Sequence, residues 1–268
     1  MELAYKKTGN GSPLIILHGL YGSSDNWMSI AKAFESEYEV YLVDQRNHGE
    51  SPHSNVHTYE EMARDLMVFM FHHSLGPASI IGHSMGGKTA SFFAAMHPEL
   101  VNKLVVVDIA IKAYDAEAVV SDKGLSHKNI IDAMLSIDPS KYENRTEISD
   151  KLLKNIPSKQ VVQFLLKNLK RQGGSFQWQL NLPALRDNLP EIYKGLDEPL
   201  VKKPDMLEEM PVLFINGELS GYLKRDDLKE IQKIFPRAQM ETIVGAGHWV
   251  HAEKTDLFLK SVKGFLSD

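Results

Sequence analysis

Short apolar segments alternate with longer helical patterns in this chain of 268 residues. The apolar segments lie at residues 14–17, 39–43, 79–81, 103–107, 212–215 and 239–243, and the helical patterns at residues 26–36, 58–74, 85–96, 226–235 and from 254 onward. Because the segments are apolar at successive positions, they are typical of central parallel strands that helices cover on both faces. The alternation therefore predicts an α/β fold built on a mostly parallel, doubly wound sheet.

The alternation stops after Asp108 and resumes only near residue 212. Between residues 113 and 205 the chain shows helical patterns interrupted by prolines, and no convincing strand. We therefore expect residues 1–112 and 206–268 to form the α/β core and residues 113–205 to form a helical cap. An insertion at the carboxyl end of a sheet strand lies where loops build active sites, so we expect the cap to cover the site.

One part of the cap is strongly basic. Residues 151–171 contain six lysines and arginines and no acidic residue, with leucine, isoleucine and phenylalanine between them. This spacing predicts an amphipathic helix whose basic face is solvated. A face turned toward a membrane or an acyl carrier is the alternative interpretation.

Composition limits the partners and the chemistry. The chain has no cysteine, which excludes disulfides, cysteine-bound zinc and a thiol nucleophile. Its net charge of -5 disfavours general binding to nucleic acid. No apolar stretch approaches the roughly 20 residues that span a bilayer, and the N-terminal apolar run is too short for a secretory signal. We therefore expect a cytoplasmic protein without stable membrane insertion.

A serine lies at a sharp strand-to-helix junction. The sequence Gly82-His83-Ser84-Met85-Gly86 follows the expected strand at 79–81 and opens the expected helix at 85–96. This context distinguishes a nucleophile elbow from a chance G-x-S-x-G match, because the strained turn needs small neighbours and lifts the serine hydroxyl out of the sheet. The sequence therefore predicts Ser84 as a catalytic nucleophile at the N-terminus of a helix.

Four blocks of the chain resemble one known family. They are residues 18–27 (HGLYGSSDNW), residues 44–52 (DQRNHGESP), the elbow at residues 82–86, and residues 245–250 (GAGHWV). These blocks are similar to the α/β-hydrolase superfamily and, within it, to the small capped esterases of the YbfF and abhydrolase-domain 11 type. The resemblance implies an α/β-hydrolase fold with a cap, serine-dependent ester hydrolysis, and no cofactor or metal.

His248 is the predicted general base. A serine hydroxyl is a poor nucleophile until a base takes its proton. His248 follows the Gly245-Ala246-Gly247 loop after the last expected strand. This position brings its ring to the same sheet end as Ser84, in the chain order serine, acid, histidine.

The acid partner of His248 has two candidates. In many superfamily members the acid follows the strand expected here at 212–215 in a G-x-x-D pattern, but this chain reads Gly217-Glu218-Leu219-Ser220. Asp108 instead ends the strand expected beside the elbow strand, from where a carboxylate can orient the histidine. The resemblance to YbfF-type proteins also points to Asp108. We therefore predict Asp108 as the acid and keep Glu218 as the alternative.

Two backbone amides are predicted to bind the negative charge of a tetrahedral intermediate. One belongs to Met85, directly after the nucleophile, and the other to Leu20, in the loop after the first apolar segment. His18 is expected to hold that loop by hydrogen bonds. The polar turn at residues 44–48 is interpreted as structural, because its spacing fits no metal site.

These residues together predict a serine hydrolase that cleaves carboxylic esters or thioesters of small to medium acyl chains through an acyl-enzyme intermediate. The expected partner is a small-molecule substrate. A carbon–carbon bond hydrolase or lyase with the same three side chains is the alternative, and a non-catalytic binding protein is less favoured. Apolar cap residues are expected to line an acyl pocket or to belong to the core: Met134, Leu135, Phe164, Phe176 and Trp178.

Overall fold

The computed structural model describes residues 1–115 and 126–267. Within these ranges, seven strands form one sheet in the order β1-β3-β2-β4-β5-β8-β9. They are β1 (Tyr5–Thr8), β2 (Ser12–Leu17), β3 (Tyr38–Val43), β4 (Ala78–His83), β5 (Val101–Val107), β8 (Val212–Gly217) and β9 (Ala238–Ile243). β1 is antiparallel to β3 and the other neighbours are parallel, which confirms the predicted mostly parallel sheet. β1 is missing from the prediction because its sequence, YKKT, has no apolar run.

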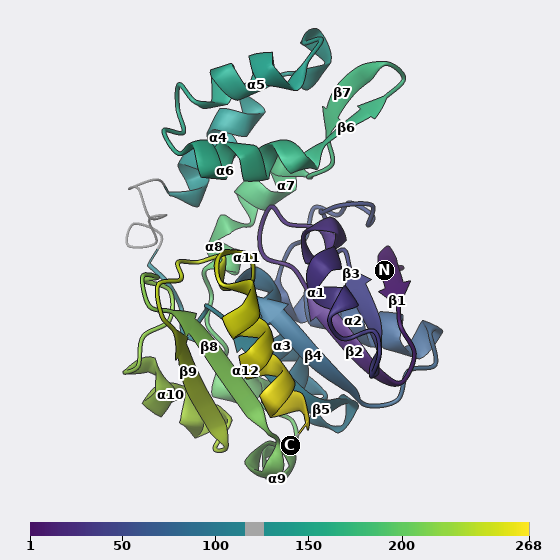
Figure 1. The fold of residues 1–268 in the computed structure, drawn as a ribbon, viewed down its shortest axis with the longest axis vertical. Helices are drawn as coiled ribbons and strands as arrows, with labels where there is room; N and C mark the ends of the chain where they lie inside the picture. The colour runs from purple at the N-terminus through teal and green to yellow at the C-terminus, as the bar shows by residue number, and fades with distance from the viewer. Residues whose placement is uncertain (116–125, 268) are drawn as a thin grey trace.

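Helices cover both faces of this sheet (Figure 1). The α-helices of the described ranges, of which α4 to α7 lie outside these two layers, are α1 (Met28–Lys32), α2 (Tyr59–His72), α3 (Met85–Met96), α4 (His127–Leu135), α5 (Arg145–Leu152), α6 (Lys159–Leu165), α7 (Leu182–Asp187), α8 (Leu189–Ile192), α9 (Pro204–Glu209), α10 (Asp227–Ile234), α11 (Val250–Glu253) and α12 (Thr255–Ser267). Successive residues of a strand point to opposite faces. Leu14 and Ile16 share one core with α1 and α12, whereas Ile15 and Leu17 share the other with α2 and α3. The predicted double winding is confirmed.

The elements between β5 and β8 gather mainly at one end of the molecule. Helices α4 to α7 and a small hairpin lie beyond the carboxyl ends of the central strands (Figure 1). This is the side to which β4, β5 and β9 deliver the predicted site residues. Residues 116–125 of the predicted cap lie outside the described residues, and the boundaries at 113 and 205 stay a prediction.

The expectation of a cap without strands is wrong. β6 (Leu169–Gln172) and β7 (Ser175–Trp178) pair as an antiparallel hairpin. Gly173 and Gly174 form its two-residue turn with φ values of 59° and 89°, a conformation that glycine adopts without strain. The Gly-Gly pair is itself a hairpin signal, but each strand has only four residues, too few for a clear alternation.

The expectation of one basic helix over residues 151–171 is also wrong. α5 ends at Leu152, α6 begins at Lys159, and the chain then passes through a short turn into β6. Ser158 caps α6 by accepting a hydrogen bond from the amide of Val161. The basic side chains of this stretch are nevertheless exposed, as expected for a solvated face: Lys151, Lys154, Lys159, Lys167, Lys170 and Arg171.

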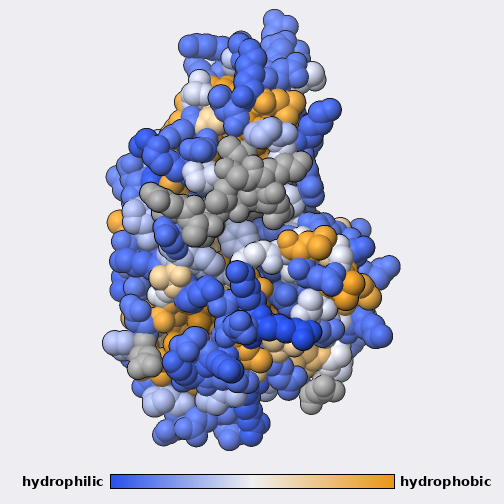
Figure 2. Space-filling view, turned by 90° about the vertical axis from the view of Figure 1, so that its left-hand side faces the viewer, coloured by the Kyte–Doolittle hydropathy of each residue, from blue (hydrophilic) through white to orange (hydrophobic). Residues whose placement is uncertain are grey.

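The face shown in Figure 2 is mainly hydrophilic, and its hydrophobic side chains form several separate groups. In the described ranges, no helix is both long enough and apolar enough to cross a bilayer. The cytoplasmic location stays a prediction.

Candidate active site

Ser84 occupies a strained turn between β4 and α3. Its φ is 52°, a left-handed value that non-glycine residues rarely adopt. The turn is possible because the residues two positions before and after Ser84 are glycines. A Cβ added to Gly82 would lie 2.3 Å from the carbonyl oxygen of Gly86, and one added to Gly86 would lie 2.4 Å from that of Leu17. The turn places Ser84 at the N-cap of α3, as the sequence predicts.

The structure brings His248 to Ser84. His248 lies in the loop between β9 and α11, and its Nε2 is 3.1 Å from the Ser84 hydroxyl oxygen. Its Nδ1 is 2.7 Å from Oδ2 of Asp108. A neutral imidazole that donates from Nδ1 keeps the lone pair of Nε2 for the serine hydroxyl. This arrangement is the one that activates a serine.

Asp108 is fully buried at the end of β5, with a φ of 52°. Its Oδ1 accepts a hydrogen bond of 2.9 Å from the amide of Gly217, and its Oδ2 also accepts one from the hydroxyl of Ser220. Glu218 is exposed, and its carboxylate accepts a hydrogen bond from the amide of Gly245. Of the two candidate acids, the structure therefore brings Asp108 and not Glu218 to His248.

Leu20 and Met85, the residues of the two predicted oxyanion amides, line one cavity together with Ser84. Leu20 and Met85 are both buried, and within the described part of the chain neither amide donates a hydrogen bond. His18 holds the Leu20 loop as expected. Its Nε2 accepts a 3.0 Å hydrogen bond from the amide of Gln45, and its own carbonyl accepts one from the Gln45 side chain. Two free amides beside a serine hydroxyl are suited to bind an oxyanion.

The polar turn at residues 44–48 supports the same loop. Nε2 of His48 accepts a hydrogen bond from the amide of Tyr21, directly after Leu20. Arg46 pairs with Asp65 at 2.6 Å, and both side chains are buried. A buried ion pair of this kind fixes the position of the turn. These contacts confirm the structural interpretation of the turn.

Two further histidines fix the loop that carries His248. His83 donates a 2.9 Å hydrogen bond to the backbone carbonyl of His248. His251 stacks on Trp27 with the ring centroids 4.0 Å apart. Burial lowers the pKa of His83 well below its usual range and lowers the pKa of His251 to about 3. Both rings are therefore neutral near pH 7, and neither adds a positive charge beside His248.

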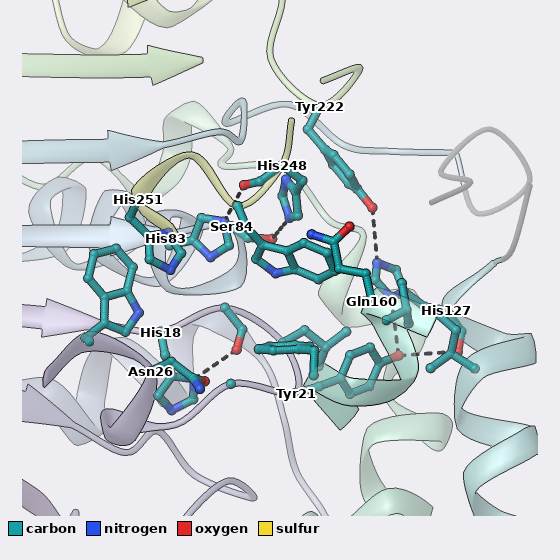
Figure 3. Close-up of a pocket in the computed structure, with 18 of the residues that line it drawn as sticks. His18, Tyr21, Asn26, His83, Ser84, His127, Gln160, Tyr222, His248 and His251 are labelled. Atoms are coloured by element: carbon teal, nitrogen blue, oxygen red, sulfur yellow. Dashed lines mark hydrogen bonds between the residues drawn. The ribbon is translucent and has the colours of Figure 1, made fainter. Parts of the chain in front are cut away.

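The sequence analysis missed two residues that contact the site. The ring of Tyr222 stacks on His248 with the centroids 4.2 Å apart, and its hydroxyl lies 3.5 Å from Nε2 of His127 (Figure 3). Nδ1 of His127 is in turn 3.2 Å from the hydroxyl of Tyr21. Burial lowers the pKa of His127 to about 4, so this ring is neutral. No local pattern marks either residue, because the contacts join segments far apart in the chain.

A cavity of about 110 Å³ opens onto Ser84 and His248. Ile130, Val161 and Phe164 line it from the cap side. Of the apolar cap residues singled out in the sequence, Phe164 therefore lines the site. Met134 and Phe176 belong to the buried core, Trp178 packs against that core, and Leu135 is exposed.

The fold and the site define an α/β hydrolase with a serine nucleophile elbow. Residues 12–255 match the family described as the alpha/beta hydrolase fold, and the chain belongs to this family. Esterase YbfF of Escherichia coli is 33% identical, with 97% of this chain and 94% of that protein covered. The sn-1-specific diacylglycerol lipase ABHD11 of Danio rerio is 39% identical, with 96% of this chain and 79% of that protein covered. A solved structure described as a marine microorganism esterase is 45% identical, with a TM-score of 0.92. The match covers 98% of this chain and 99% of that chain.

Proposed function

We propose that this chain is a serine esterase in which Ser84 is the nucleophile, His248 the general base and Asp108 the acid that orients it. One observation carries the proposal. A hydrogen-bonded relay joins the hydroxyl of Ser84, the imidazole of His248 and the carboxylate of Asp108. The serine–histidine distance is 3.1 Å and the histidine–aspartate distance is 2.7 Å. The similarity to esterases over nearly the whole chain supports the same reaction.

The relay suits a two-step acyl transfer. The hydroxyl oxygen of Ser84 attacks the acyl carbonyl while Nε2 of His248 takes its proton. His248 then gives this proton to the oxygen of the leaving alcohol, and an acyl-enzyme remains. A water molecule attacks the acyl-enzyme with His248 again as the base, which releases the acid and restores Ser84.

Two kinds of contact stabilise the charges that develop. Asp108 keeps the proton on Nδ1 of His248 and stabilises the imidazolium. The amides of Leu20 and Met85 bind the oxyanion, and each such donor typically lowers the barrier by about 3 kcal/mol. The substrate is a carboxylic ester or a thioester, because both present the carbonyl carbon that this arrangement attacks. None of these steps uses a cofactor or a metal ion.

A fluorophosphonate probe tests this assignment. It phosphonylates only a serine that a neighbouring base activates, so we expect the wild-type protein to be labelled and Ser84→Ala not to be labelled. Ser140→Ala, an exposed serine on the cap, is the matched control and should label like the wild type. A folded wild-type protein that the probe does not label would contradict the proposal.

A further inference from the structure

Two cavities adjoin at Ser84 and share part of their lining. The larger one, of about 110 Å³, is also lined by His248, and the smaller one, of about 30 Å³, is also lined by Met85. Both are lined by Leu20, Ser84, His127 and Tyr222. The site is therefore divided into two compartments of different size.

The chemistry of the relay assigns each compartment to one half of an ester. The leaving oxygen must receive its proton from Nε2 of His248, so the alcohol half lies on the His248 side. The larger cavity contains that side. The acyl chain stays attached to the carbonyl carbon beside Ser84 and points away from the leaving oxygen, so it lies on the side without His248. Of the two cavities, the smaller is lined by Met85 and not by His248.

We propose that the smaller cavity is the acyl pocket and restricts the enzyme to short acyl groups, whereas the larger cavity binds the alcohol half. This assignment rests on the proposed function. A cavity of roughly 10–15 Å³ holds one water molecule, so 30 Å³ accommodates about two or three carbon atoms beyond the carbonyl. The acyl groups that fit range from acetyl to butyryl.

The walls of the smaller cavity are fixed. The hydroxyl of Tyr59 donates a 2.7 Å hydrogen bond to the carbonyl of Ile192, and the hydroxyl of Tyr114 accepts one of 2.8 Å from the amide of Ala110. The buried Nζ of Lys88 lies behind these rings, 4.6 Å from the centroid of Tyr114 and 5.5 Å from that of Tyr59. Because the rings of Tyr59 and Tyr114 are held at the hydroxyl and packed at the face, they cannot move to admit a longer acyl chain.

The larger cavity has a different character. Its lining includes the apolar side chains of Trp27, Ile130, Val161, Phe164 and Trp249. Core and cap both contribute, so the cavity lies between them. An apolar alcohol half gains binding energy here in proportion to the surface that it buries. The favoured substrate is therefore a short-chain ester of a larger, apolar alcohol.

Two series of esters test the assignment. In the acyl series, p-nitrophenyl acetate, butyrate, hexanoate and octanoate, we expect kcat/KM to be highest for acetate or butyrate and about 100-fold lower for octanoate, since a methylene that does not fit costs tenfold or more. In the alcohol series, ethyl, butyl and hexyl acetate, we expect kcat/KM to rise with chain length.

Variants in the two cavities separate their roles. Ile192→Ala enlarges the smaller cavity and should raise the hexanoate-to-acetate ratio of kcat/KM about tenfold. Ile192→Val is the graded variant and should raise the ratio less, which keeps the test valid if the larger truncation unfolds the protein. Val161→Ala, in the larger cavity, should change the alcohol series and leave the acyl ratio as in the wild type.

Fluorophosphonate labelling of every variant distinguishes a wrong pocket assignment from a wrong proposed function. If the protein labels at Ser84 but prefers octanoate, or if Val161→Ala and not the Ile192 variants changes the acyl ratio, the pocket assignment is wrong while the proposed function stands. If the wild-type protein neither labels nor cleaves any ester, the proposed function itself is wrong.

Discussion

The hydroxyl of Ser220 donates a hydrogen bond to the carboxylate oxygen of Asp108 that also contacts His248. Ser220 occupies the position where many α/β hydrolases carry the acid, after the strand that is β8 here. Under the proposed mechanism, the serine therefore supports an acid that lies at the end of the neighbouring strand, β5. This relationship explains the departure from the G-x-x-D pattern and leads to a first pair of predictions.

Asp108→Asn should lower kcat by about 10⁴-fold, because the amide no longer holds the productive tautomer of His248. Glu218→Gln is the matched control, since Glu218 is the other carboxylate considered for this role and is exposed. It should change kcat less than about twofold. Steady-state kinetics with p-nitrophenyl acetate measures both, and the reverse order of effects would assign the acid to Glu218.

Ser220→Ala should lower kcat about tenfold with little change in KM, because it removes one of the hydrogen bonds that hold the carboxylate of Asp108. Ser220→Thr retains a hydroxyl and should restore most of the activity. A threonine variant as impaired as the alanine variant would show that packing, and not the hydrogen bond, determines the effect.

Gly19→Ala should lower kcat about 10- to 100-fold by displacing the loop that carries the Leu20 amide. A Cβ at Gly19 would lie 2.8 Å from Nδ1 of His83 and 3.2 Å from Cβ of Ser84. Gly76→Ala is the control, because a Cβ there meets no atom within 4 Å. We expect the control to retain wild-type kinetics, and equal losses in both variants would contradict the role of this loop.

Stability should fall in mild acid. Burial lowers the pKa of His57 and His251 to about 3 and that of His127 to about 4, so the unfolded chain binds more protons than the folded one below about pH 6.5. Each of these histidines contributes fully to the free energy of unfolding above the pKa that it has in the unfolded chain. This contribution is lost as the pH falls toward the lower pKa that it has in the folded protein. Between pH 7 and pH 5 each histidine should account for about 2 kcal/mol.

Urea unfolding at these two pH values measures the effect. His57→Gln removes one of the titrating groups and should reduce the difference in unfolding free energy between pH 7 and pH 5 by about 2 kcal/mol. An unchanged difference in the variant would mean that His57 is not held neutral by burial.

Local patterns in the sequence were sufficient for six of the seven strands of the sheet, the elbow at Ser84 and the position of His248. Each of these depends on a run of apolar residues or on glycines within a few positions. The choice between Asp108 and Glu218 remained open because both follow neighbouring strands of the sheet. In the structure Asp108, at the end of β5, contacts His248, whereas the loop after β8 leaves Glu218 exposed and bonded to the amide of Gly245.

Contacts between distant segments could not be predicted in this way. Tyr222 and His127 are 95 positions apart, and their contact depends on how the cap lies over the core. The hairpin of β6 and β7 and the interruption of the basic stretch are local features that were missed for a different reason. Short, half-exposed elements carry a weak periodic signal, and packing decides their conformation.

The central claim is that Ser84 carries the acyl group during turnover. Rapid acid quenching during the hydrolysis of p-nitrophenyl acetate, followed by mass spectrometry of peptides, tests it most directly. We predict a transient mass increase of one acetyl group on the peptide that contains Ser84, absent from Ser84→Ala. Full ester hydrolysis by a Ser84→Ala variant, or acetylation only at another residue of the wild-type protein, would contradict the account.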